Sequence, residues 1–210
     1  MSFARELVTE AAIGVGIAEN PAGLRTLHRP GCAAVIWRRQ PPVGFQSWID
    51  AMDVDLLPRT QMFLAPGKIA GAMDTLCAKA GMPAGEERDW LAADIATLAE
   101  LFSWVMPAPL LRLRLIVGST YARPKFHVDE TSARLICTYR GPGTQYGVSI
   151  NGADPTKILT IPTGAPAILR GKYWPEGQRS GVLHRSPPTV ALGETRFLLI
   201  LDPVAGAANA

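Results

Sequence analysis

Cysteine is scarce in this chain and cannot provide a covalent framework. Cys32, Cys77 and Cys137 are few, odd in number and widely spaced. This pattern does not match the disulfide scaffold of a small secreted protein, and it lacks the paired Cys-x-x-Cys of a structural zinc site. We therefore expect reduced thiols and a cytoplasmic protein.

Long apolar runs and concentrated charge are also missing. No stretch reaches membrane-spanning length without a charge, and the N-terminus lacks the apolar core of a signal peptide. The net charge is only +3, and the basic residues are scattered rather than gathered in a stripe that could follow nucleic acid. We expect no membrane or nucleic-acid partner but a small-molecule or peptide substrate, and the oligomeric state stays open.

The length of 210 residues fits one structural domain. Residues 1–108 are predicted to be mixed and helical, residues 109–204 to be rich in strands, and residues 205–210 to be a flexible tail. A short strand is expected at 33–37 and helices at 45–52, 67–80 and 85–105. The last helix is the clearest, because its apolar residues step by three and four along one face: Leu91, Ile95, Leu98, Phe102 and Val105.

Beyond Pro109 the pattern changes to short apolar runs separated by Gly and Pro turns. Such spacing is typical of an all-β barrel or jelly roll. The sequence therefore predicts an α+β fold with a mainly β core, in which the N-terminal helices pack on the larger sheet. Eight runs are predicted to be strands: 110–117, 125–129, 134–140, 145–149, 157–161, 166–170, 181–185 and 195–201.

Two of the three histidines suggest a metal site. His127 and Asp129 form a His-x-Asp on the second run, where a spacing of two places both side chains on one face, and His184 lies on the seventh run. Two imidazoles and a carboxylate can hold three adjacent positions on a divalent metal and leave the opposite face open, as in the facial triad of non-haem Fe(II) oxygenases. The alternative is a pair of inert, hydrogen-bonded histidines.

Arg196 opens the final apolar run. A planar guanidinium there suits a bidentate clamp on a carboxylate, and a buried arginine needs some partner. The alternative is a salt bridge to Glu194 or Asp202.

Three further residues are candidates for binding a co-substrate. Arg134 lies on the third run on a face shared by positions 136, 138 and 140, whereas Tyr139 lies on the opposite face, and either face could point inward. Tyr139 could instead be a core aromatic, and Thr144 could be a simple turn residue.

Arg112 and Arg114 alternate with leucines on the first run. This alternation predicts a half-buried strand with a solvated basic face.

The placement of His127, Asp129, His184 and Arg196 on the predicted strands resembles the double-stranded β-helix of the Fe(II)/2-oxoglutarate oxygenase superfamily. The turn at 141–144 (GPGT) also resembles the Gly-Gly-x-Thr turn of its prolyl-hydroxylase branch. The resemblance covers the second half of the chain. It implies a hydroxylase in which the triad binds Fe(II), and Arg196 binds the far carboxylate of the co-substrate 2-oxoglutarate.

Segments 138–144 (TYRGPGT) and 184–188 (HRSPP) resemble the bacterial domain-of-unknown-function family 1826, and this resemblance covers most of the chain. The family implies no activity, and an association with zinc-homeostasis genes leaves two alternatives open. One is a cupin-like metalloenzyme without 2-oxoglutarate, and the other is a non-catalytic metal-binding protein. Zinc or another divalent metal could then replace iron.

Overall fold

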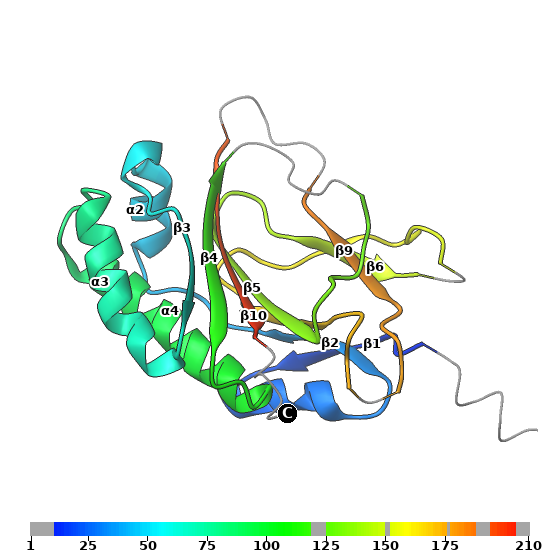
Figure 1. Ribbon diagram of the computed structural model, residues 1–210. Helices are drawn as coiled ribbons and strands as arrows, with labels where there is room; N and C mark the ends of the chain where they lie inside the picture. The colour runs from blue at the N-terminus through cyan, green and yellow to red at the C-terminus, as the bar shows by residue number, and fades with distance from the viewer. Residues whose placement is uncertain (1–10, 119–124, 150–151, 176, 188–193, 205–210) are drawn as a thin grey trace, which may run out of the picture.

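The computed structural model describes residues 11–118, 125–149, 152–175, 177–187 and 194–204. Within them, seven strands form a large sheet in the order β1-β2-β8-β5-β10-β4-β3, and three strands form a small sheet in the order β7-β6-β9. Figure 1 shows the helices on one side of the large sheet and the small sheet on the other. The strands are β1 (Gly14–Ala18), β2 (Cys32–Trp37), β3 (Thr60–Leu64), β4 (Leu111–Gly118), β5 (Ala133–Arg140), β6 (Gln145–Val148), β7 (Leu159–Thr160), β8 (Ala167–Arg170), β9 (Val182–Arg185) and β10 (Arg196–Pro203).

The expected helices are present. They are α2 (Phe45–Ala51), α3 (Ile69–Lys79) and α4 (Glu86–Val105), together with the short 3-10 helices η1 (Pro21–His28), η2 (Val54–Leu56) and η3 (Pro66–Lys68). The predicted apolar face of α4 is buried, and three acidic residues occupy its first turn, where the helix dipole favours negative charge. None of the described helices has the length and hydropathy needed to cross a membrane.

Strand β10 lies between β4 and β5 and separates two hydrophobic layers. Phe197, Leu199 and Leu201 belong to the main core under the helices. Leu198 and Ile200 belong to a second core on the side of the small sheet. Because neighbouring side chains of a strand point to opposite faces, one strand supplies both layers.

The first half of the chain contributes more sheet than the sequence indicated. Besides the expected strand β2, it adds β1, which pairs in parallel with β2, and β3, which pairs with β4 at the other edge. Strand β1 contains two glycines, and glycine lowers strand propensity. The mixed and helical region predicted from the sequence thus contains three strands rather than one.

The predicted strand 125–129 is wrong as a regular strand. Only one antiparallel bridge joins it to the small sheet, between His127 and His184. Beyond that bridge the chain turns to another segment, since the carbonyl of Asp129 accepts a hydrogen bond from the N–H of Lys172 at 2.8 Å.

A bulge near the end of β5 interrupts the alternation of its side chains between the two faces of the sheet. Tyr139 points to the helices, as expected for a face opposite Arg134. The pairing between β10 and β5 shifts after Phe197, which lies opposite Arg140. Arg140 consequently leaves the face of Arg134, and its Nη1 donates to the carbonyl of Met52 at 2.7 Å.

Tyr139 connects β5 to α4. The side chain is fully buried, and its hydroxyl donates to Oδ2 of Asp94 at 2.6 Å. Asp94 also pairs with Arg39 from the segment after β2. Burial and the Asp94 carboxylate raise the pKa of Tyr139, so the phenol stays a donor.

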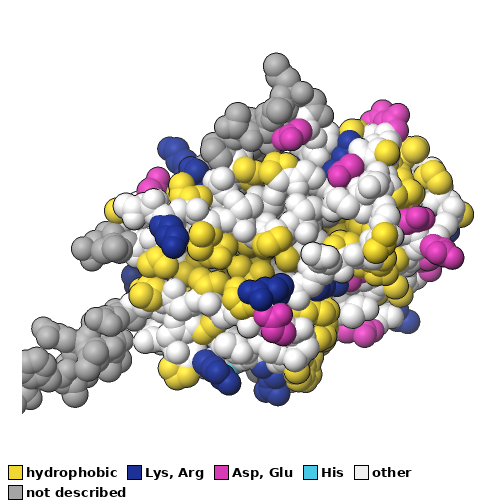
Figure 2. Space-filling model, turned by 180° about the vertical axis from the view of Figure 1, so that it is seen from behind, with side chains coloured by type: hydrophobic (Ala, Val, Ile, Leu, Met, Phe, Trp, Pro, Cys, Tyr) yellow, Lys and Arg dark blue, Asp and Glu magenta, His cyan; other side chains and the backbone are white. Residues whose placement is uncertain are grey.

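The exterior carries mixed charge. Figure 2 shows Lys, Arg, Asp and Glu side chains interspersed on the rear face, with hydrophobic side chains gathered near its centre.

Replacing Tyr139 with phenylalanine tests the link to Asp94. Because the change removes a buried hydrogen bond to a carboxylate, Tyr139→Phe should lower the free energy of unfolding by roughly 1.5–3 kcal/mol. Urea denaturation of both proteins gives this difference. An unchanged midpoint would show that the Asp94 contact contributes nothing.

Candidate metal centre

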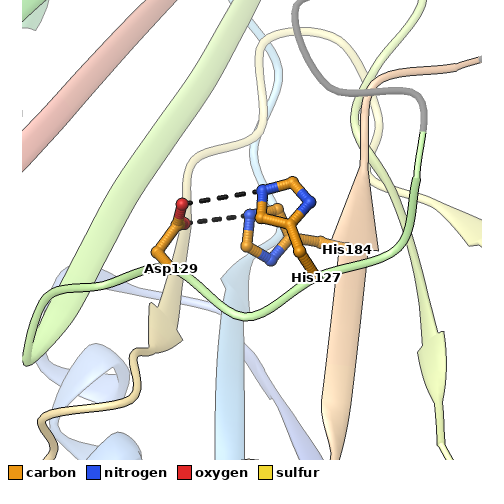
Figure 3. A group of neighbouring side chains, drawn as sticks. All are labelled: His127, Asp129 and His184. Carbon is orange, nitrogen blue, oxygen red and sulfur yellow. Dashed lines mark ion pairs between the residues drawn. The ribbon is translucent and has the colours of Figure 1, made fainter.

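The pairing of two backbone segments brings the histidines together. His184 lies on β9, and His127 lies on the extended segment beside it. Their backbone N–H and C=O groups exchange two hydrogen bonds of 3.0 Å, and the ring centroids are 4.5 Å apart. Asp129 follows two residues later, and the candidate ligand atoms of all three residues lie within 4.8 Å of one another (Figure 3).

The histidine nitrogens that face Asp129 are both Nε2. His184 Nε2 is 2.9 Å from Oδ2 of Asp129, and His127 Nε2 is 3.6 Å from Oδ1. His127 Nδ1 lies 2.9 Å from the carbonyl oxygen of Lys125. A carbonyl can only accept, so Nδ1 carries the proton and the Nε2 lone pair is available to a metal.

The pKa values of two ligands favour the forms that bind metal. Burial raises the pKa of Asp129, but its contacts with the two imidazoles and the positive charge of Arg134 outweigh burial and lower the pKa well below its usual range. Burial is the main reason that the pKa of His184 is lowered. A carboxylate and a neutral imidazole are the states that a divalent metal requires.

Arg134 holds Asp129 in place. Its guanidinium pairs with Oδ1 of Asp129, and its Nε donates to Oδ1 of Asp202 at 2.6 Å. Because both acceptors are carboxylates, Arg134 is held between them and acts on the triad through Asp129.

Asp202 is shared with two more arginines. Its Oδ2 accepts from Nη2 of Arg112 at 2.6 Å and from Nη2 of Arg114 at 2.7 Å. The expected half-buried alternation of this strand is confirmed, but the basic face is not simply solvated, because Arg112 and Arg114 are only partly exposed and both pair with Asp202. The pattern of one strand did not reveal the acid on the neighbouring strand.

Arg196 lies at the start of β10 and is surrounded by neutral acceptors. Its Nε donates to the carbonyl of Pro142 at 2.8 Å, and its remaining nitrogens approach three hydroxyls at 3.3–3.4 Å: those of Thr138, Thr144 and Ser186. Among the described residues no carboxylate pairs with it, so the alternative salt bridge to Glu194 or Asp202 is not formed. Burial lowers the pKa of Arg196 to about 10, which still leaves the guanidinium charged at pH 7.

The glycine turn before Thr144 fits closely around Arg196. Gly141 has φ +76°, a conformation that other residues rarely adopt, and a Cβ at Gly143 would lie 1.8 Å from the carbonyl oxygen of Ile161. Glycine at both positions lets the turn present the Pro142 carbonyl and the Thr144 hydroxyl to Arg196. The sequence pattern indicated Thr144 as a binding residue but not Thr138 or Ser186, although both lie in the segments that resemble family 1826.

His127, His184 and Arg196 line one cavity of ≈ 170 Å³, and the buried Asp129 lies beside it. Tyr139 does not line it, because this side chain lies on the opposite face of the large sheet, and its assignment to a co-substrate is corrected accordingly. The described lining residues are Arg114, Ile116, Val117, Gly118, His127, Arg134, Ile136, Thr144, His184, Arg185, Ser186, Arg196, Leu198 and Ile200.

A sequence profile assigns the chain to a family. The profile described as "Protein of unknown function (DUF1826)" matches residues 18–202. The chain belongs to this family. Its sequence has no significant match among curated proteins.

The fold is similar to that of solved dioxygenases. The rice dioxygenase for auxin oxidation aligns at 13% identity over 93% of this chain and 84% of its own, with a TM-score of 0.52. The dioxygenase for auxin oxidation 1 from Arabidopsis thaliana, solved with 2-oxoglutarate, aligns at 12% identity over 92% of this chain and 93% of its own, with a TM-score of 0.53. At these identities the likeness concerns the fold, and it agrees with the mainly β expectation.

The metal site should be separable from folding. His184→Ala should abolish binding of a divalent metal but change the melting temperature little, because the two hydrophobic cores do not depend on the ion. Metal analysis of the purified protein, equilibrium titration and thermal melts measure both effects.

The third histidine provides a matched control. His28 lies outside the triad and contacts the carbonyl of Val105, so His28→Ala should retain full metal binding. Equal metal content in the His184→Ala and wild-type proteins would remove His184 from the site.

Proposed function

We propose that the protein is an Fe(II)- and 2-oxoglutarate-dependent oxygenase that hydroxylates its substrate, built on a double-stranded β-helix. The observation that carries the proposal is that His127 and His184, which form a candidate metal-binding group with the buried Asp129, share one cavity with a buried cation, Arg196, that has no acidic partner among the described residues. A metal with three protein ligands keeps positions open for other molecules.

The donor set fits the metal. Imidazole and carboxylate ligands suit Fe(II), although they also accept zinc and other divalent ions. His127 would bind through Nε2, because Nδ1 is occupied by the Lys125 carbonyl. Arg134 would orient Asp129 from behind, which leaves the other carboxylate oxygen to the metal.

Arg196 would bind the co-substrate. A buried guanidinium with no charged partner among the described residues favours a carboxylate, and the neutral oxygens around it fix its orientation without cancelling its charge. Thr144, beside Arg196, would add a hydroxyl to the same end of the co-substrate. When bound, Fe(II) and 2-oxoglutarate supply the oxygen-dependent chemistry, and the chain supplies positioning and exclusion of water.

The alternatives predict different ligands. A non-catalytic zinc site would need a fourth protein ligand, and the described metal-binding group contains three residues. A cupin-like enzyme without 2-oxoglutarate would not need Arg196 as a carboxylate clamp, and this residue has only neutral partners among those that the structure describes. These observations support the oxygenase proposal over both alternatives.

Variants of Arg196 test the co-substrate. Arg196→Lys should weaken 2-oxoglutarate binding modestly, since the charge remains but the two-point geometry is lost. Arg196→Met should weaken binding by roughly 1.5–3 kcal/mol or more, because a charge-assisted hydrogen-bonded pair is removed. Anaerobic calorimetric titration of 2-oxoglutarate into the Fe(II)-loaded protein measures both, and iron content should equal that of the wild type.

Two results would contradict the proposal. Unchanged affinity in Arg196→Met would remove Arg196 from the co-substrate site. Failure of the metal-loaded wild type to bind 2-oxoglutarate would favour the cupin-like or zinc-binding alternatives.

A further inference from the structure

The cavity holds more positive charge than the proposed co-substrate needs. Four of its described lining residues are arginines, and none is acidic. The two carboxylates beside it, Asp129 and Asp202, already face Arg112, Arg114 and Arg134. Arg185 and Arg196 have only neutral described partners. Since a divalent metal adds two charges and 2-oxoglutarate removes two, an excess of positive charge remains after both have bound.

The excess lies at two separate places: at Arg196, which has no acidic partner among the described residues, and at Arg114, which belongs to a group of three arginines that share two carboxylates. Arg196 pairs across the sheet with Gly118, and Arg114 lies four residues from Gly118 on the same strand, opposite Ile200. Four strand residues correspond to roughly 13 Å. The two side chains also diverge, because Arg196 contacts Thr144 and Ser186 whereas Arg114 contacts Asp202.

One five-carbon diacid cannot serve both places. With C–C bonds of roughly 1.5 Å, its terminal carbons are at most about 6 Å apart. If Arg196 takes one end and the metal the other, the Arg114 end of the cavity is left for a second molecule.

The Arg114 end is the more open one. Arg196 is 9% exposed, whereas the side chains of Arg114 and Arg112 are 20% and 35% exposed. A second molecule can therefore reach Arg114 when 2-oxoglutarate is already bound at Arg196.

Arg114 has N–H groups that form no hydrogen bond with the described residues. A guanidinium carries five N–H groups, and the structure shows one hydrogen bond from Arg114, to Asp202. Its Nε is buried and has no hydrogen-bond partner among the described residues. A buried donor of this kind costs free energy unless a partner binds it. The wall beside it is apolar, formed by Ile116, Ile136 and Ile200.

We propose that the primary substrate is a small organic oxyanion and that Arg114 binds its carboxylate or phosphate group, with Arg112 beside it and the carbon skeleton on the apolar wall. This inference rests on the proposed function, which assigns Arg196 and the metal to 2-oxoglutarate. Arg114 thereby selects the substrate by charge and leaves the co-substrate untouched.

The test uses the full chain loaded with Fe(II) and saturated with 2-oxoglutarate under anaerobic conditions. The probes are a panel of aliphatic and aromatic monocarboxylates, phosphate monoesters of matching size, and the primary amides of the same acids, titrated by calorimetry. At least one acid or phosphate should bind while its neutral counterpart binds much more weakly. The phosphate and carboxylate arms decide which oxyanion is preferred.

Variants assign the binding to Arg114. Arg114→Gln should weaken the best anionic probe by roughly 10- to 100-fold and leave 2-oxoglutarate affinity unchanged. Arg114→Lys keeps the charge near Asp202 and protects folding, yet it should still weaken the probe because it loses the planar fork. Arg38→Gln is the matched control, since it removes an exposed charge outside the cavity and should change neither affinity.

The outcomes separate the two proposals. Amides that bind as well as their acids throughout the panel, or Arg114→Lys and Arg114→Gln proteins that bind the probe like the wild type, overturn the oxyanion inference. A wild type that fails to bind 2-oxoglutarate overturns the proposed function, and titrating the acids and amides into the metal-loaded protein then still tests Arg114.

Discussion

The alternation of β10 is the constraint on which both sides of the molecule depend. Every second side chain packs under the helices, and the intervening Arg196, Leu198 and Ile200 line the cavity, with Asp202 beside it. Because the strand is central and paired on both sides, neither set can move without the other. The position of the charged groups is therefore set by the same packing that stabilises the sheet.

The metal ligands lie partly on a regular strand and partly on an irregular segment. His184 is fixed by a strand, whereas Asp129 lies on an irregular segment and relies on Arg134 for its position. Arg134 in turn is held by Asp202. A chain of charged contacts thus carries the rigidity of β10 to a loop residue that has no strand of its own.

Much of this arrangement could be predicted from local patterns, and the remainder depends on neighbours. The period of α4, the two-residue spacing of His127 and Asp129, and the strand positions of His184 and Arg196 are local, so the sequence reveals them. The alternation of residues on β5 predicts two faces but does not indicate which face lines the cavity. The sequence therefore could not decide whether Tyr139 belongs to the cavity or to the core under the helices. Nor does one strand indicate a bulge at Arg140 or the acid that Arg112 and Arg114 share.

The bridge between His127 and His184 has a consequence for strand registration. The two metal ligands are also backbone partners, and His184 pairs with Tyr146 on its other side. A slip of β9 by one residue would turn His184 to the opposite face and destroy the triad. A bound ion would therefore stabilise this register of β9 against the alternative registers. Metal binding should depend on the register, and the register should be more stable when the metal is bound.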